Sequence, residues 1–234
     1  MILLNHKKYE SDNPDARSRE IMEKTIAWFE KKGRGKNKAD LASLVWYQDF
    51  LDFQAEEGIF STLLTPSKYA IDSGDARWDT WRNCEMNEIL GFYGLSYWYT
   101  WQVSILGLGP LWMSNNEEIK HRTARLLKDG GIFGFGLSER EHGADVYSTE
   151  MSLKRDGDQW LANGSKYYIG NGNKAAIVST LGKIEGTEDF VFFAVDSQGG
   201  GYELVKNIVS DQMFVAEYAL HDYPITNSEI LETG

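Results

Sequence analysis

Glycines and polar residues that could hold a planar or anionic ligand gather in one stretch of the sequence, residues 131–173. It opens with an apolar run that carries Gly134 and Gly136 at alternate positions, a pattern that predicts a strand without side chains on one face. Another backbone or a flat ligand could approach such a face. A polar loop with Ser138 and Gly143 follows, where a hydroxyl and backbone N–H groups could contact an anion or the edge of a heteroaromatic ring.

Two turn sequences then lead to a second segment rich in glycine. The triplet Asp156-Gly157-Asp158 predicts a hairpin, and the pair Asn163-Gly164 predicts a second turn. The residues that follow, 166–173, again place aromatic residues beside glycines.

In their order and separation, the two segments resemble the two flavin-contacting signatures of the acyl-CoA dehydrogenase flavoproteins. The first signature is matched by Gly136-Leu137-Ser138-Glu139, then Gly143-x-Asp145 and Ser148. The second is matched by Asn163-Gly164-x-Lys166-x-aromatic-Ile169-x-Asn171-Gly172. The resemblance implies an FAD-dependent oxidoreductase that desaturates an acyl-CoA thioester at the α,β position. It also implies electron-transfer flavoprotein or oxygen as the electron acceptor.

The resemblance further implies which residues contact FAD. Three positions address the polar end of the flavin through backbone and hydroxyl groups: Phe135, Leu137 and Ser138. Two positions approach the pyrophosphate and the thioester ligand, Gly143 and Ala144, and Ala144 is therefore also the candidate substrate contact. The segment over the other edge of the ring comprises Tyr168, Ile169 and Gly170. A reduced flavin needs hydrogen-bond donors near its pyrimidine and an apolar wall that excludes water.

Four residues depart from the pattern of the family. His142 replaces a small residue, Ala144 replaces the usual Ser or Thr, Tyr168 replaces Trp, and Gly170 replaces Thr. The change at Ala144 removes a hydroxyl that would bond phosphate, and the change at Gly170 removes one that would contact the reactive flavin nitrogen. These departures leave two alternatives open: an acyl-CoA oxidase or flavin monooxygenase on the same scaffold, and a non-catalytic binding module that retains the fold.

The loop residues 139–145 also permit a metal-binding interpretation. They contain three carboxylates and His142, but they lie in one short loop with Arg140 among them, and no second cluster accompanies them. A solvated acidic loop and a flavin contact both explain this sequence better than a metal site.

Composition limits the classes of function. The chain has 234 residues, 42% of them hydrophobic, and a formal charge of −11, which argues against binding nucleic acid. No apolar run is long enough for a membrane helix, and the N-terminus lacks a secretory signal, so a cytoplasmic location is expected. The single Cys84 excludes an intrachain disulfide. The one basic cluster, residues 31–38, is interpreted as a solvated loop between helices.

The first half of the sequence predicts helices. Asn13-Pro14-Asp15 is typical of a helix start, and Gly33 and Gly35 should end that helix. A second helix is expected over residues 39–57, and an aromatic segment over residues 78–106 in which Tyr93, Tyr97 and Trp101 share a face that is buried in a core or an interface. The sequence 114–117 has the form of a capping box for a helix that ends near residue 130, with Glu118 and Arg122 paired on its surface.

The second half predicts strands, because apolar residues alternate at Met151 and Leu153 and again at Phe214, Ala216, Tyr218 and Leu220. The run 191–195 should form a buried strand, and Gly199-Gly200-Gly201 a hairpin loop. The expected fold class is α+β: an N-terminal helical domain, residues 1–130, followed by a β-barrel-like domain of packed antiparallel sheets, residues 131–234, that carries the flavin-contacting segments.

The resemblance covers two of the three domains of the family. The C-terminal helical bundle, which in relatives supplies the catalytic carboxylate and the main oligomer contact, has no counterpart here, so no residue is assigned as catalytic base. The expected partners are an acyl-CoA substrate and the electron acceptor, with a homo-oligomer for the full-length form.

Overall fold

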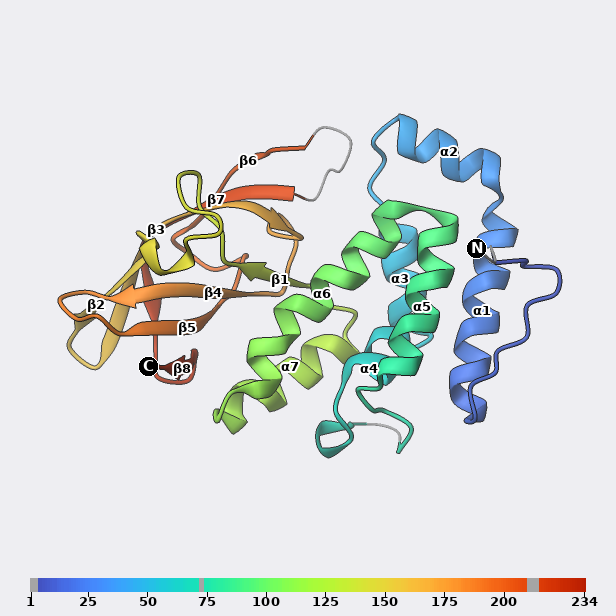
Figure 1. Cartoon of the computed structure of the whole chain (residues 1–234), viewed down its shortest axis with the longest axis horizontal. Coiled ribbons are helices and arrows are strands. Elements are labelled where there is room, and N and C mark those ends of the chain that lie inside the picture. The colour runs from blue at the N-terminus through green and yellow to red at the C-terminus, as the bar shows by residue number, and fades with distance from the viewer. Residues whose placement is uncertain (1–3, 72–73, 210–214) are drawn as a thin grey trace. The chain divides into compact units, whose positions relative to one another are not determined.

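The computed structural model describes residues 4–71, 74–209 and 215–234 (Figure 1). Helices precede strands along the chain, which confirms the predicted α+β class. The chain divides into two compact units: unit 1 is Met1–Gln102 with Leu127–Gly130, and unit 2 is Val103–Leu126 with Gly131–Gly234. The division into domains 1–130 and 131–234 stays a prediction.

The helical elements come first. In chain order they are α1 (Ala16–Lys32), α2 (Arg34–Ala42), α3 (Gln48–Glu56), α4 (Ile59–Leu64), the single turn η1 (Ser67–Tyr69), α5 (Thr80–Tyr93), α6 (Leu95–Met113) and α7 (Glu117–Lys128).

Local sequence explains where α1 begins and ends. The Asp15 side chain accepts a hydrogen bond from the Ser18 amide at 2.7 Å, so Asp15 is the N-cap and the helix begins two residues later than a start at Pro14 would place it. Gly33, at φ +80°, ends the helix as predicted.

The second expected helix was wrong in its bounds. Residues 31–38 are not a loop, because α2 starts at Arg34 directly after Gly33. The chain then turns at Leu44, which has φ +52°, before α3 begins at Gln48. Two short helices therefore replace the single helix predicted over residues 39–57.

Aromatic rings fill the core of unit 1. Tyr93, Tyr97 and Trp101 are 9%, 2% and 0% exposed, which confirms their burial. They do not lie on one continuous helix, because Gly94 separates α5 from α6. Tyr93 stacks on Phe29 of α1 with ring centroids 4.4 Å apart.

The helix α7 begins one residue after its cap. The Asn116 side chain accepts from the Ile119 amide at 3.1 Å, so Asn116 is the N-cap in place of the predicted Ser114. The predicted partner of Arg122 was wrong as well. Its guanidinium lies 3.4 Å from Glu229 and 3.5 Å from Asp196, both in unit 2.

The strands form one mixed sheet. They are β1 (Phe133–Gly136), β2 (Ser152–Asp156), β3 (Gln159–Gly170), β4 (Ile177–Ile184), β5 (Phe190–Val195), β6 (Tyr202–Asn207), β7 (Val215–Ile225) and β8 (Ile230–Thr233). Their order is β6-β7-β3-β2-β4-β5-β8, with β1 also paired to β4. The pairs β1–β4 and β2–β4 are parallel and the others antiparallel.

Three details of the strands differ from the prediction. Gly164 does not form a turn but lies inside β3, at φ +136° beside a shift of register against β7. Residues 199–201 connect β5 to β6, which are not paired, so they are not a hairpin loop. Along β7, residues 215–220 are all buried, so burial does not alternate there; Phe214 lies outside the described residues.

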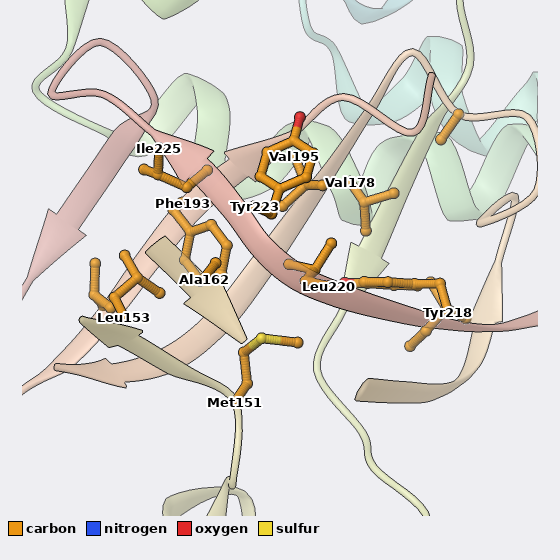
Figure 2. Packing of buried hydrophobic residues seen from close by; sticks show 13 residues of the cluster. Met151, Leu153, Ala162, Val178, Phe193, Val195, Tyr218, Leu220, Tyr223 and Ile225 are labelled. Carbon is orange, nitrogen blue, oxygen red and sulfur yellow. The ribbon is translucent and has the colours of Figure 1, made fainter. Parts of the chain in front are cut away.

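The core of unit 2 lies between the strands. Figure 2 shows Leu153, Ala162 and Phe193 beside Ile225, which lies at the end of the curved β7. Met151 and Leu153 are both fully buried, as their alternation predicted. In residues 4–71, 74–209 and 215–234, no helix has both the length and the apolar character needed to cross a membrane.

Candidate functional site

The candidate site is built on a loop that leaves the sheet and returns to it. Residues 133–136 of β1 pair with residues 177–180 of β4, and Ser152 and Leu153 of β2 pair with Lys183 and Ile184 of the same strand. The strands β1 and β2 thus pair with consecutive parts of β4, and the chain between them, residues 137–151, leaves the sheet as a loop. We call it the excursion loop; it includes the single turn η2 (Val146–Ser148).

A buried carboxylate closes the base of the excursion loop. Glu139 lies at the start of the loop and accepts hydrogen bonds from two residues at the end of the loop. The donors are the Thr149 hydroxyl and the Glu150 amide, the latter at 2.8 Å. Lys166 of β3 donates to Glu139 at 2.7 Å, to the Leu137 carbonyl at 2.9 Å and to Thr149 at 3.1 Å. We call Glu139, Thr149 and Lys166 the neck of the loop.

The neck holds its charges away from water. The side chains of Lys166 and Glu139 are 0% and 6% exposed. Burial alone would raise the pKa of Glu139, but hydrogen bonds from Lys166, Thr149 and the Glu150 amide hold it below its usual value. Burial lowers the pKa of Lys166, and the ion pair with Glu139 opposes this change. The neck is thus a fully paired buried network that fixes both ends of the loop.

The tip of the loop, residues 142–145, lies at the surface. Asp145 accepts from the Gly143 amide at 3.0 Å and pairs with His142 Nδ1 at 2.8 Å. This contact with Asp145 raises the pKa of His142. Gly143 and Ala144 are exposed, and within the described residues the Ala144 amide has no hydrogen-bond partner. The tip can therefore offer one free N–H group to an anion.

A cavity of about 390 Å³ adjoins the loop. It is lined by residues 139–142, Glu150, residues 163–165 of β3 and residues 219–221 of β7. Arg140 at its edge donates two hydrogen bonds to the buried Glu217, at 3.0 and 2.5 Å, and stacks 4.7 Å from the Tyr167 ring. This bidentate pair ties the loop to β7.

The glycines of β1 do not open the strand to a ligand. A Cβ on Gly136 would collide with the Tyr218 hydroxyl, and one on Gly134 would lie 3.1 Å from the Gly170 carbonyl. On the helical side, a Cβ on Gly107 of α6 would collide with the Gly134 carbonyl. The close approach that the sequence indicated is therefore made by the protein itself, and the flat-ligand interpretation of this face was wrong.

The other residues of the first segment connect it to the second. The Ser138 hydroxyl donates to the Tyr167 carbonyl at 2.7 Å, and the Tyr167 amide donates to the Ser138 carbonyl at 2.9 Å. The Leu137 carbonyl accepts from Lys166. Phe135 is half-buried and stacks with Phe192 at 6.0 Å. The Ser138 hydroxyl proton is thus engaged within the chain, while its lone pairs can still accept.

The second segment contains the most unusual backbone of the site. Tyr168 has φ +69° and is 57% exposed, within a shift of register between Lys166 and Ile169 against β7. A left-handed conformation is uncommon for an aromatic residue and often marks function. Ile169, by contrast, is 1% exposed in the core, and Gly170 is buried.

The structure brings some of the predicted residues together and leaves others apart. Hydrogen bonds join Leu137 and Ser138 to β3, but in the described part of the chain none joins Gly143 or Ala144 to residues 168–170. Thr149 and Glu217 are functional in fixing the loop and were missed. Neither lies near its partners in the sequence, so no local signal could have identified them.

The metal interpretation gains no support. Across residues 4–71, 74–209 and 215–234, no group of three or more His, Cys, Asp or Glu side chains could hold a metal ion. Glu139, which would have been one ligand, is committed to Lys166.

The comparisons with known proteins all point to acyl-CoA dehydrogenases. Residues 134–210 match the family model described as the middle domain of acyl-CoA dehydrogenases. A probable acyl-CoA dehydrogenase of Mycobacterium tuberculosis is 39% identical over 74 residues, which is 31% of this chain and 19% of that protein. A similar protein of Mycobacterium leprae is 31% identical over 106 residues, 44% of this chain and 27% of that protein.

Solved structures agree on the fold. Butyryl-CoA dehydrogenase from Megasphaera elsdenii superposes with a TM-score of 0.79 at 19% identity, over 94% of this chain and 60% of that chain. A glutaryl-CoA dehydrogenase from Mycobacterium smegmatis in complex with FADH2 superposes with a TM-score of 0.75 at 18% identity. This match covers 92% of this chain and 55% of that chain. Residues 134–210 are thus similar to the middle domain of acyl-CoA dehydrogenases, and the chain shares its fold with solved acyl-CoA dehydrogenases. It spans about three fifths or less of the length of each of these relatives.

Proposed function

We propose that unit 2 binds FAD as part of an acyl-CoA dehydrogenase-like oxidoreductase. The observation that carries this proposal concerns Tyr168. Its ring is exposed, and its backbone is held in a left-handed conformation. Such strain persists only where surrounding structure enforces it, and here β3 is paired with β7 on both sides of Tyr168, at Lys166 and at Ile169. An exposed ring in a fixed position suits stacking on a planar ligand.

The donor set fits a ligand that combines a planar ring with phosphate. Tyr168 and the half-buried Phe135 supply aromatic surface. The free amide of Ala144 beside the exposed Gly143 suits an anionic group, and Ser138 can accept a hydrogen bond from a ring N–H. Ile169 can contribute only backbone atoms, because its side chain lies in the core. The backbone of Leu137 and Gly170 completes the candidate surface.

FAD, when bound, would accept the hydride equivalent removed from an acyl-CoA thioester during α,β-desaturation. The residues of this chain would bind and orient it: Tyr168 through its ring, Ala144 through its amide at the phosphate or thioester side, and Ser138 at the polar edge. The base that removes the α-proton is not assigned to any residue of this chain. Electron-transfer flavoprotein or oxygen as acceptor, and a homo-oligomeric full-length enzyme, belong to the same proposal.

Two residues favour a second candidate within the same class. Gly170 offers no hydroxyl to a flavin, and Ala144 offers none to a phosphate. An acyl-CoA oxidase or flavin monooxygenase would tolerate a changed contact at the flavin, and a prolyl acyl carrier protein oxidase shares the fold with a TM-score of 0.75 at 21% identity. A binding module without catalysis is the remaining alternative.

A flavin titration tests the proposal. Addition of the chain to FAD should shift the visible absorption bands and quench the flavin fluorescence. Tyr168→Asn retains a residue that tolerates positive φ but lacks the ring, so it should weaken FAD binding roughly tenfold. Tyr147→Asn is the matched control, since Tyr147 is also an exposed tyrosine, 73% exposed, but its backbone is not left-handed. Unchanged FAD spectra, or equal losses for both variants, would contradict the proposal.

A further inference from the structure

A second cavity lies within unit 1, far along the sequence from the flavin-contacting segments. Its volume is about 200 Å³, and it lies where the end of α1 meets α2 and the end of α5. Its lining consists of an aromatic wall, of Gly33, and of one side of α2. The wall is Phe29, Phe92 and Tyr93, and the α2 residues are Arg34, Asn37, Lys38 and Leu41. Figure 1 shows α2 running across the ends of α1 and α5.

Two cations at this cavity have no counter-ion within the described chain. Arg34 and Lys38 are exposed and one helical turn apart on α2, and no carboxylate of the described residues pairs with either. Like charges at this spacing destabilise a helix by a few tenths of a kcal/mol, that is about 0.2–0.5 kcal/mol. An anion between them would remove this repulsion.

Neighbouring cations of the same segment are paired. Lys32 lies 2.7 Å from Asp49 and 3.2 Å from Asp40, and Lys36 lies 2.6 Å from Asp40. Glu30, the acid at the end of α1, accepts from the Tyr93 hydroxyl at 2.8 Å and pairs with His6 at 3.2 Å. In a protein with a net charge of −11, the carboxylates around this cavity are thus directed to other partners.

The aromatic wall is fixed in place. Phe29 and Tyr93 are stacked, and both are buried. Asn37 donates to the Tyr93 carbonyl at 2.8 Å and accepts from the Tyr97 hydroxyl at 2.6 Å, so it joins α2 to α5 and α6. The Arg34 guanidinium lies 5.2 Å from the centre of the half-buried Phe92 ring. The cavity therefore combines an apolar wall with two exposed cations on α2.

We propose that this cavity binds a small planar anion, an aromatic carboxylate or phosphate of one ring, with its ring against Phe92 and its charge between Arg34 and Lys38. The volume suits a single ring with its anionic group, below the range of about 300–1,000 Å³ typical of drug-sized sites. The proposal concerns unit 1 only and does not depend on flavin binding.

Phenyl phosphate is the probe, and its binding to the whole chain is measured by saturation-transfer NMR and by titration. The ring protons should receive saturation, and Arg34→Gln and Lys38→Gln should each weaken binding about tenfold. Lys31→Gln is the matched control, because Lys31 is an exposed lysine of the same segment that does not line the cavity; it should bind as the parent does.

A second variant tests the planar part of the ligand. Phe92→Leu should weaken binding of phenyl phosphate but leave the weaker binding of inorganic phosphate unchanged. The thermal midpoint of each variant shows that it is folded. No saturation transfer at millimolar phenyl phosphate, or equal affinities for the parent, Arg34→Gln and Lys38→Gln, would overturn the proposal.

Discussion

The neck and the tip of the excursion loop contain similar ion pairs in opposite surroundings. At the neck, Lys166 and Glu139 lie 2.7 Å apart and are almost completely buried. At the tip, His142 and Asp145 lie 2.8 Å apart, with side chains 22% and 56% exposed. The short distances alone would suggest equal importance. Burial distinguishes them. Removing one partner at the neck leaves the other charge buried and unpaired, whereas at the tip the remaining charge is hydrated.

This difference separates the scaffold from the surface that is free to bind. The neck joins the loop to β3 and thereby fixes both ends of the loop, including the backbone of Leu137. The tip is held by contacts within the loop itself, from Asp145 to His142 and Gly143 and from the Glu139 amide to the His142 carbonyl. A ligand can therefore change the tip without disturbing the sheet.

The largest expected effect is at the neck. Lys166→Met should lower the free energy of unfolding by about 3–5 kcal/mol, because Glu139 would be left charged and buried without its partner. Lys174→Met, at an exposed lysine, is the control and should change stability little. Chemical denaturation measures both. A loss below about 1 kcal/mol for Lys166→Met would mean that the neck does not hold the loop.

The next effect concerns the packed face of β1. Gly136→Ala should destabilise the protein by about 1–3 kcal/mol, because the added Cβ collides with the Tyr218 hydroxyl. Adding Tyr218→Phe should recover part of this loss. Gly143→Ala at the tip is the matched control, since its Cβ would meet nothing within 4 Å. In thermal unfolding, Gly136→Ala should have the lowest midpoint, the double variant a higher one and Gly143→Ala the highest. Equal midpoints for Gly136→Ala and Gly143→Ala would show that β1 is not closely packed.

A smaller effect depends on pH. Because the pKa of Glu139 is lowered in the folded state, its contribution to stability is present above its unfolded pKa and is lost as pH falls through the folded value. Thr149→Val removes one hydrogen bond to this carboxylate and should cost about 1 kcal/mol at neutral pH. It should also move the midpoint of acid unfolding to higher pH, as monitored by circular dichroism. An unchanged acid midpoint would show that Glu139 does not control it.

The smallest effect is at the tip. The pKa of His142 is raised by Asp145, so the pair contributes below the unfolded pKa of His142 and is lost as pH rises through the folded value. Asp145→Asn should bring the pKa of His142 back toward its ordinary value while leaving the thermal midpoint nearly unchanged. NMR titration of the imidazole protons measures this. A large drop in the thermal midpoint of Asp145→Asn would show that the tip, like the neck, stabilises the fold.

Sequence patterns were sufficient where contacts are local. The change from helices to strands, the burial of Met151 and Leu153, and the helix end at Gly33 all depend on composition, alternation or the conformational freedom of glycine. The break at Leu44 was not predictable in this way, because leucine rarely adopts a left-handed conformation and no glycine marks the turn.

The candidate site was predictable as two segments but not as an arrangement. Gly134 and Gly136 indicated a close approach, yet only the fold shows that Tyr218 and Gly170 make it. The salt bridge between Glu139 and Lys166 joins residues 27 positions apart, and its burial depends on where β3 crosses the loop. The left-handed backbone at Tyr168 coincides with a shift of register against β7, which the local sequence does not indicate.

Hydrogen–deuterium exchange of the chain with and without FAD tests most directly whether the tip and Tyr168 form the binding surface on a fixed neck. We expect FAD to slow exchange in peptides that contain residues 143–145 and 168–170, and to leave the helices of unit 1 unchanged. Exchange that FAD alters only outside these two segments, or does not alter at all, would contradict the assignment of the flavin surface to unit 2.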